Sequence, residues 1–123
     1  MNKRPHSITF IGCLSIAAGT AGLVFLSLQD SLGAAAHRDA GFGLPQGIET
    51  ALLLVIRLLA VVGGAFLLRG RHWARWLLAL WMVYHLALSA LHSITDFIIH
   101  AVSFGAICYL LFRPAASAYF RRS

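Results

Sequence analysis

The sequence predicts an all-α integral membrane protein with four transmembrane helices. Of its 123 residues, 59% are hydrophobic and only 11% are charged, whereas a soluble domain carries about a quarter charged residues. The mean hydropathy is +0.79, and apolar runs long enough to cross a hydrocarbon core of about 30 Å recur along the chain. This composition excludes a soluble globule, a disordered tail and a disulfide scaffold. It also excludes a nucleic-acid binder, despite a net charge of +6.

Each helix is predicted by an apolar run of about 20 residues with few charges. The first covers about 7–28 without a charge, and the second covers about 48–68 with one charge, Arg57. The apolar stretch from Trp73 to Phe112 would form a helix of roughly 60 Å, twice the bilayer core, so it must fold back. We therefore expect two further helices, over about 73–92 and 94–112. The whole chain is expected to form a single domain, with an outer loop over 29–47, a cytoplasmic loop over 69–72 and a cytoplasmic tail over 113–123.

The third and fourth helices are predicted to form a tight hairpin. Ser93-Ile94-Thr95-Asp96 matches the capping box, in which side chains satisfy the free amides at the start of a helix. No glycine or proline marks this turn, so one continuous helix that protrudes from the membrane is the alternative.

Basic residues predict that both termini are cytoplasmic, since Lys and Arg near helix ends stay on that side. On the opposite, outer side, the sequence has a single basic residue, Arg38, together with all four acidic residues. Trp73, Trp76 and Tyr119 are expected as aromatic anchors at the cytoplasmic interface. The cytoplasmic basic residues are Lys3, Arg4, Arg69, Arg71, Arg75, Arg113, Arg121 and Arg122, and the outer acids are Asp30, Asp39, Glu49 and Asp96.

The N-terminus has an alternative interpretation as a cleavable signal peptide, because a basic start and an apolar run precede Ala34-Ala35-Ala36. The apolar run is longer than the roughly 7 to 15 residues of a signal h-region. We therefore expect the first helix to be retained.

Small residues predict a close contact made by the first two helices, because helices in lipid associate where small side chains let the backbones approach. Gly12, Gly19 and Gly22 share one face of the first helix, and Ala60 and Gly64 have the small-xxx-small spacing on the second. These faces could meet each other in one chain or meet another copy in an oligomer.

Ionisable groups at membrane depth predict a polar seam, since each costs about 2.5 to 3.5 kcal/mol at a helix centre and needs a partner or a function. Arg57 lies near the middle of the second helix, with Tyr84 and Glu49 as candidate neighbours. Helical spacing places polar residues on one face of each hairpin helix, and counting outward from the turn puts Ser89 level with His100. The candidate site residues are Arg57, His85, Ser89, His92, Asp96 and His100.

Three interpretations of this seam stay open. Its polar groups could join the helices by hydrogen bonds. The histidines, whose ordinary pKa is about 6.5, and Arg57 could form a proton or small-anion site. His92, Asp96 and His100 could bind zinc or another first-row metal, although the spacing matches no specific metal motif. No other cofactor is expected.

The segment Gly70-Arg71-His72-Trp73-Ala74-Arg75-Trp76 contains a Gly-Arg-x-Trp-Ala-Arg pattern at the cytoplasmic start of a helix. It resembles one found in small uncharacterised bacterial four-helix inner-membrane proteins, and residues 8–23 are similar in style. The resemblance covers two short segments. It implies an inner-membrane location without an activity.

The sequence favours a non-enzymatic function. It contains no nucleophile with a base at recognisable spacing, no P-loop, no GxGxxG and no CxxC, and the outer loop is too short for a catalytic domain. We expect a small protein of the lipid bilayer that associates with itself or with a larger membrane partner, and not with nucleic acid. The alternative is a polar-site protein that binds or transports protons, small anions or a metal through the seam.

Overall fold

The computed structural model describes residues 4–31 and 44–121, apart from the side chains of Asp30 and His92. This described part contains five helices and no strand, and the first four helices are long and apolar enough to cross a membrane. The predicted all-helical class with four potential spans is confirmed. The helices are α1 (His6–Ser31), α2 (Gln46–Leu68), α3 (His72–His92), α4 (Ile94–Phe112) and α5 (Pro114–Arg121).

Two boundaries differ from the sequence prediction. α1 continues to Ser31, beyond its predicted end near 28, and α2 begins at Gln46, directly after Pro45. Most of the predicted outer loop, including Arg38, Asp39 and the three consecutive alanines, falls on residues 32–43 and lies outside the described part of the chain.

The predicted tail over 113–123 contains the fifth helix, α5, which the sequence analysis missed. Arg113 has φ −58° and ψ 155°, an extended conformation that a following proline favours and that ends α4. Pro114 then occupies the first position of α5, where its fixed φ and missing amide hydrogen are tolerated.

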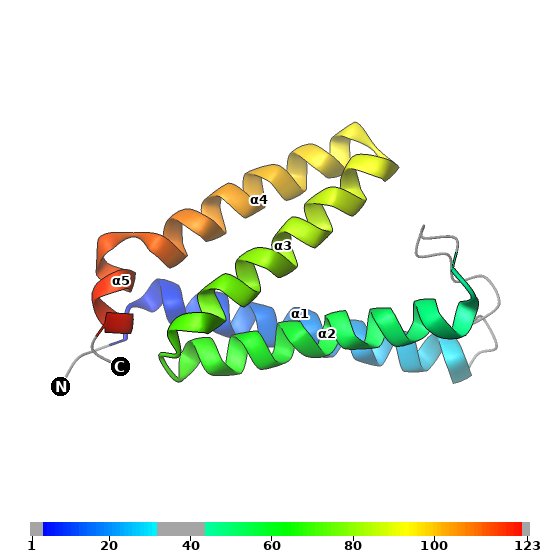
Figure 1. The fold of residues 1–123 in the computed structure, drawn as a ribbon, viewed down its shortest axis with the longest axis horizontal. Helices are drawn as coiled ribbons and strands as arrows, with labels where there is room; N and C mark the ends of the chain where they lie inside the picture. Colours follow the sequence, from blue (N-terminus) through cyan, green and yellow to red (C-terminus); the bar gives the residue numbers. More distant parts are fainter. Residues whose placement is uncertain (1–3, 32–43, 122–123) are drawn as a thin grey trace.

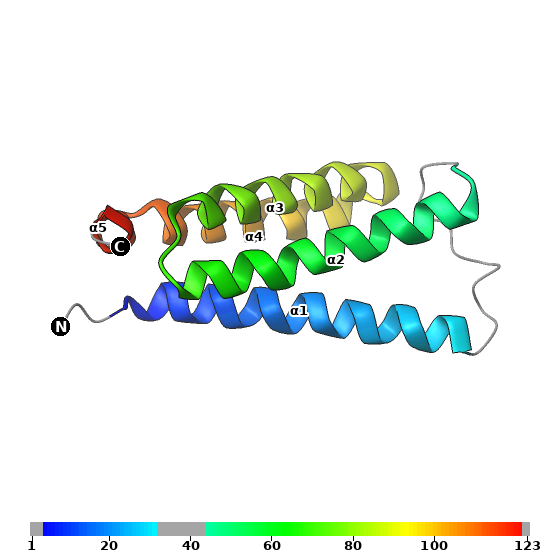
Figure 2. The same cartoon turned by 60° about the horizontal axis from the view of Figure 1, so that its bottom comes forward.

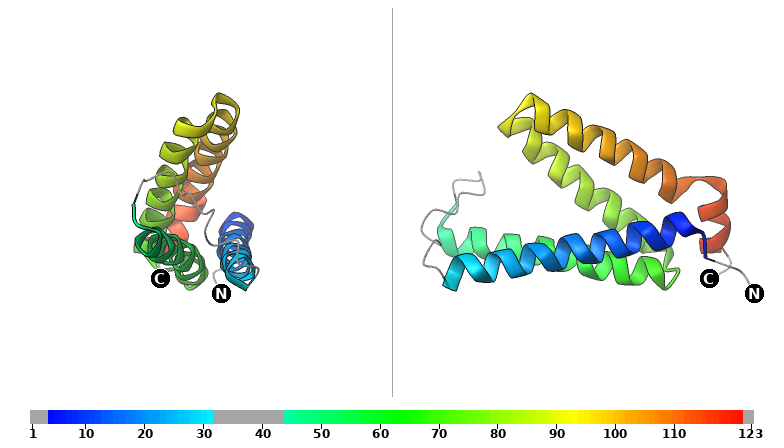
Figure 3. Two further views of the ribbon diagram at one scale, coloured as in Figure 1. Left: turned by 90° about the vertical axis from the view of Figure 1, so that its right-hand side faces the viewer. Right: turned by 180° about the vertical axis from the view of Figure 1, so that it is seen from behind.

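The four long helices form two neighbouring pairs. α1 lies antiparallel beside α2, and α3 lies antiparallel beside α4 (Figures 1 and 2). The pairs are close together near α5 and diverge toward the turn between α3 and α4 (Figure 3). The N-terminal end of α1, the α2–α3 turn and α5 therefore lie at the same end of the molecule (Figure 1).

The main buried cluster lies at this end, where all four long helices and α5 approach one another. We call it the basic end, because the described arginines other than Arg57 gather there. The described acids, Glu49 and Asp96, lie in the first turns of α2 and α4, at the opposite ends of these helices. The buried cluster consists of Ile8, Ile11, Leu67, Ala74, Leu78, Leu111, Ala116 and Phe120, and the arginines are Arg4, Arg69, Arg71, Arg75, Arg113 and Arg121.

Glycines bring α1 and α2 into backbone contact. A Cβ atom on Gly64 would lie 2.7 Å from the carbonyl oxygen of Gly12, and one on Gly19 would lie 2.8 Å from the carbonyl oxygen of Arg57. Ala60 is fully buried on the same side of α2. The two small-residue faces therefore meet each other within one chain, which is the first of the two arrangements that the sequence left open.

Candidate functional site

Arg57 lies over a notch that Gly22 leaves in α1. A Cβ atom on Gly22 would come within 2.5 Å of Arg57 Cδ and within 2.6 Å of its Nε. The side chain is half-buried, and within the described residues its guanidinium has no carboxylate partner. Glu49, one candidate neighbour, instead accepts a hydrogen bond from the amide of Leu44 at 3.3 Å, at the start of α2.

Arg57 belongs to a polar and aromatic group halfway along the bundle, which we call the midspan cluster: Arg57, Trp81, Tyr84, His85 and His100. Trp81 connects the group to α2, because its Nε1 donates a hydrogen bond to the carbonyl oxygen of Ile56, the residue before Arg57. The His85 ring has its centroid 4.2 Å from that of Trp81 and 5.1 Å from that of Tyr84. The cluster thus joins α2, α3 and α4.

The rings of His85 and His100 are stacked, with centroids 6.4 Å apart and an interplanar angle of 16°. The sequence analysis placed Ser89 level with His100, so this register prediction was wrong by about one helical turn. The structural turn is the single residue Ser93, and counting outward from it brings His85 and His100 to the same level.

Both histidines are hydrogen-bonded to their own helices. Nδ1 of His85 lies 3.0 Å from the carbonyl oxygen of Trp81, and Nδ1 of His100 lies 2.8 Å from that of Asp96. A carbonyl only accepts, so each Nδ1 carries the hydrogen and each Nε2 keeps a lone pair in the neutral ring. Metal-binding and proton-accepting histidines are commonly oriented by such a bond.

Ser89 of the predicted seam and Ser103 of α4 also bond within their own helices. The Ser89 hydroxyl donates to the carbonyl oxygen of Leu86 at 2.9 Å, and that of Ser103 donates to Ile99 at 2.7 Å. Such local bonds satisfy a hydroxyl without a partner on another helix. A bond that does cross between helices comes from Trp81, whose Nε1 donates to the carbonyl oxygen of Ile56 at 3.0 Å.

The remaining seam residues lie near the α3–α4 turn. Ser93 is the N-cap of α4, and its hydroxyl accepts from the amide of Asp96 at 3.0 Å, which confirms the predicted cap. The Asp96 side chain is exposed. The His92 side chain lies outside what the structure describes. Among the described residues, no group of three or more His, Cys, Asp or Glu side chains could hold a metal ion.

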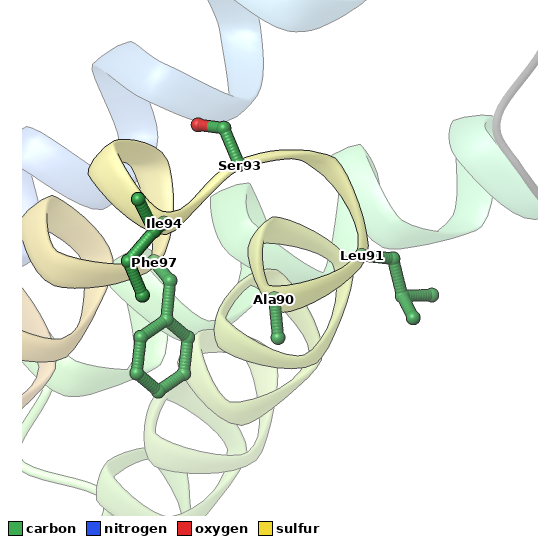
Figure 4. A pocket seen from close by; sticks show the side chains of 5 residues that line it. All are labelled: Ala90, Leu91, Ser93, Ile94 and Phe97. Carbon is green, nitrogen blue, oxygen red and sulfur yellow. The ribbon is translucent and has the colours of Figure 1, made fainter.

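A shallow hollow of about 330 Å³ lies under this turn. Figure 4 shows Ala90 and Phe97 on one side of the turn, whereas the Ser93 side chain points the other way. Apart from Ser93, whose hydroxyl is used as the cap, the hollow is lined by apolar residues. It therefore lacks the polar groups that would orient a ligand.

A second polar centre, which was not predicted from the sequence, lies at Arg75. This residue is only 4% exposed, and its guanidinium carbon lies 5.0 Å from the ring centroid of Phe112 and 4.7 Å from that of Phe120. The guanidinium donates to Ser117 Oγ at 3.2 Å, to the carbonyl oxygen of Leu111 at 3.5 Å and to His72 Nε2. Arg75 thus fastens α3 to the end of α4 and to α5.

One signal could have identified Arg75. It stands three and seven residues before Leu78 and Met82, which are both buried, so helical spacing puts a charged residue on the buried stripe of α3. The other half of the site could not be found in this way, because Phe120 belongs to the helix that the sequence analysis treated as a tail.

The predicted interface anchors lie at the basic end. Trp73 is 47% exposed and Trp76 is 61% exposed, so both have ring surface available for contact with lipid. Tyr119 is half-buried, and its hydroxyl lies 3.5 Å from the carbonyl oxygen of Leu68. Tyr119 therefore also ties α5 to the end of α2.

Comparisons with protein-family models, with curated proteins and with solved structures give no match to this chain.

Proposed function

We propose that the protein is a multi-pass protein of the bacterial inner membrane with both termini in the cytoplasm. The separation of the basic end from the two described acids supports this orientation, since Lys and Arg near helix ends stay on the cytoplasmic side. The resemblance of the Gly-Arg-x-Trp-Ala-Arg segment to small inner-membrane proteins supports the location.

Within the membrane, the protein acts without catalysis, through helix–helix association with itself or with a membrane partner. Gly105, in the middle of α4, is the observation that carries this proposal. A Cβ atom there would have nothing within 4 Å, yet glycine in a helix interior costs about 1 kcal/mol relative to alanine. Gly12, Gly19 and Gly64 make close contacts between α1 and α2 inside the chain, whereas Gly105 is open to a contact outside it.

The surroundings of Gly105 fit a helix contact. Only 6% of the residues in the apolar segment of α4 are buried, whereas 28% are buried in the apolar segments of α1, α2 and α3. Gly105 and Ala106 are both exposed on α4, and Ala101 precedes Gly105 at the small-xxx-small spacing. A second helix could approach the α4 backbone closely here, which is how helices associate in lipid.

The test is Gly105→Leu, with Ala17→Leu as the matched control, because Ala17 is an exposed small residue near the middle of α1. We expect Gly105→Leu to reduce the oligomer or the co-purified partner at least about tenfold, as a lost close contact would. Light scattering and quantitative mass spectrometry of protein solubilised with native lipid would measure this. The monomer should remain folded, because leucine is a better helix former than glycine. Unchanged assembly in Gly105→Leu, or an equal loss in both variants, would contradict the proposal.

The second candidate function is binding or transport of protons, a small anion or a metal at the midspan cluster. The observation that favours it is the stacking of His85 on His100, with both Nδ1 atoms held by carbonyl oxygens. A charged residue at membrane depth, grouped with titratable side chains, is a recognised mark of ion and proton sites.

Metal analysis of the purified protein and of His85→Ala/His100→Ala tests for a bound metal. A proton-flux assay in proteoliposomes tests for proton transport. His6→Ala is the control, because His6 is exposed at the basic end, away from the cluster. A bound metal or a proton flux that the double variant alone loses would favour the midspan function. A metal-free protein without flux would count against it.

A further inference from the structure

A second cavity lies at the basic end, between the α2–α3 turn and α5. Its volume is about 570 Å³, and it is distinct from the midspan cluster. Two arginines, one histidine and three aromatic side chains line it together with Gly70: Arg69, Arg71 and His72, and Phe66, Trp73 and Phe120. We propose that this cavity binds a phosphate group, carried either by the headgroup of an anionic membrane lipid or by a free phosphate.

The turn places two arginines at one cavity. Arg69 follows the end of α2 and Arg71 precedes α3, and Gly70 between them has φ 76°, a left-handed conformation that glycine adopts without strain. Both arginines are exposed, and neither meets a carboxylate within the described part of the chain. Paired arginines bind phosphate oxygens well, because the guanidinium fork matches their geometry.

His72 supplies a third donor. Its Nε2 is close to the guanidinium of Arg75, and a guanidinium only donates, so Nε2 accepts. The hydrogen of the neutral ring is therefore on Nδ1, which can donate to an anion. α3 begins at His72, and the positive end of its helix dipole adds a favourable field for an anion, although the amide of Ala74 in this first turn already donates to the carbonyl oxygen of Arg71 at 3.1 Å.

The aromatic rings make the cavity amphipathic. Phe66 and Trp73 are packed together with centroids 5.0 Å apart, and the guanidinium of Arg69 lies 5.5 Å from the Phe66 ring centroid. A lipid phosphate is joined to a glycerol backbone and acyl chains, which would lie against such rings. Basic pockets at the cytoplasmic ends of membrane helices bind anionic headgroups in this way.

The test compares two variants that lose the same charge at the same end. Arg69→Gln/Arg71→Gln removes both cavity arginines. Arg4→Gln/Arg121→Gln removes two exposed arginines that do not line the cavity. Native mass spectrometry of the detergent-solubilised protein would measure the binding of phosphatidylglycerol and of phosphatidylcholine with the same chains. Calorimetry would measure the binding of inorganic phosphate.

We expect the cavity variant to bind phosphatidylglycerol about tenfold or more weakly than the wild type, since each arginine near an anionic headgroup contributes appreciably. The control should lose less than about threefold, because its arginines add only long-range attraction. If only the lipid binds, the phosphate belongs to a headgroup. If inorganic phosphate also binds and the cavity variant loses it, the ligand is a free phosphate.

Equal losses in the two variants would overturn the proposal, because general surface charge would then explain the binding. No preference for phosphatidylglycerol over phosphatidylcholine, together with no phosphate binding, would also overturn it. The variants are suited to this comparison because all four side chains are exposed, so their replacement leaves the buried cluster intact.

Discussion

The backbones of Gly12 and Gly64 are in direct contact across the α1–α2 interface. A Cβ atom on Gly64 would lie 2.7 Å from the carbonyl oxygen of Gly12, and one on Gly12 would lie 3.2 Å from that of Gly64. Close approach of this kind allows dispersion contacts along both helices, which is how helices without a hydrophobic driving force associate in lipid. The close packing of α1 and α2 therefore depends on glycines, which have no side chain that would keep the two backbones apart.

We predict that Gly64→Leu destabilises the protein by about 1 to 3 kcal/mol or more, because a side chain there requires the helices to separate. Reversible unfolding by sodium dodecyl sulfate in mixed micelles would measure the change. Val62→Leu is the control, since Val62 is 39% exposed on the same helix, and it should change stability by less than about 0.5 kcal/mol. A Gly64→Leu protein as stable as the control would show that α1 and α2 do not pack here.

Much of the fold follows from the sequence because the signals are local. The length of each apolar run is set by the thickness of a bilayer, and the Ser93 cap is set by four consecutive residues. The small-residue faces were also visible, because glycines recur at helical spacing. Whether those faces meet within one chain depends on how the helices are paired, which a periodic pattern does not contain.

The candidate site was harder to predict, because it depends on the register and rotation of helices that are distant in sequence. The stacking of His85 on His100 follows from a turn of one residue, and an error of one turn was enough to assign His100 a different partner. Arg75 was recognised as a basic residue, but the rings that enclose it come from α4 and from a helix that follows a proline. Arg75 is therefore buried only when α3, α4 and α5 pack together.

Replacing Arg75 by lysine should loosen α5. Lysine keeps the charge, but it cannot stack a planar group between Phe112 and Phe120 or reproduce the hydrogen bonds to Ser117 and Leu111. We predict a loss of about 1 to 2 kcal/mol in the docking of α5. Because Phe120 is only 4% exposed, cleavage after this residue by chymotrypsin should become about tenfold faster or more. Arg4→Lys, which changes an exposed arginine, should leave the rate unchanged, and equal rates in both variants would refute the role of Arg75.

The start of α4 should depend on the hydroxyl of Ser93. Ser93→Ala removes the acceptor of the Asp96 amide, and loss of an N-cap costs about 0.5 to 2 kcal/mol. Hydrogen exchange of the Asp96 amide should accelerate by a corresponding factor, whereas Ser93→Asp, which restores an acceptor, should keep the protection. If alanine and aspartate gave the same exchange rate, the turn between α3 and α4 would have to be held by something other than this cap.

The notch at Gly22 predicts a specific dependence on Arg57. Gly22→Leu would collide with the side chain of Arg57, whereas Gly19→Leu would collide with the α2 backbone, at the carbonyl oxygen of Arg57 and the amide of Val61. Arg57→Ala removes the first obstacle but not the second. We therefore expect Gly22→Leu to be destabilising alone and to lose at least about 1 kcal/mol of that effect in the Arg57→Ala background, the size of coupling found between residues in contact.

Gly19→Leu should remain equally destabilising in both backgrounds, and it serves as the matched control on the same face of α1. The four unfolding free energies of each double-mutant cycle provide the measurement. Two cycles with the same coupling would mean that Arg57 does not occupy the notch. A coupling confined to Gly22 would show that this glycine makes room in α1 for the side chain of Arg57.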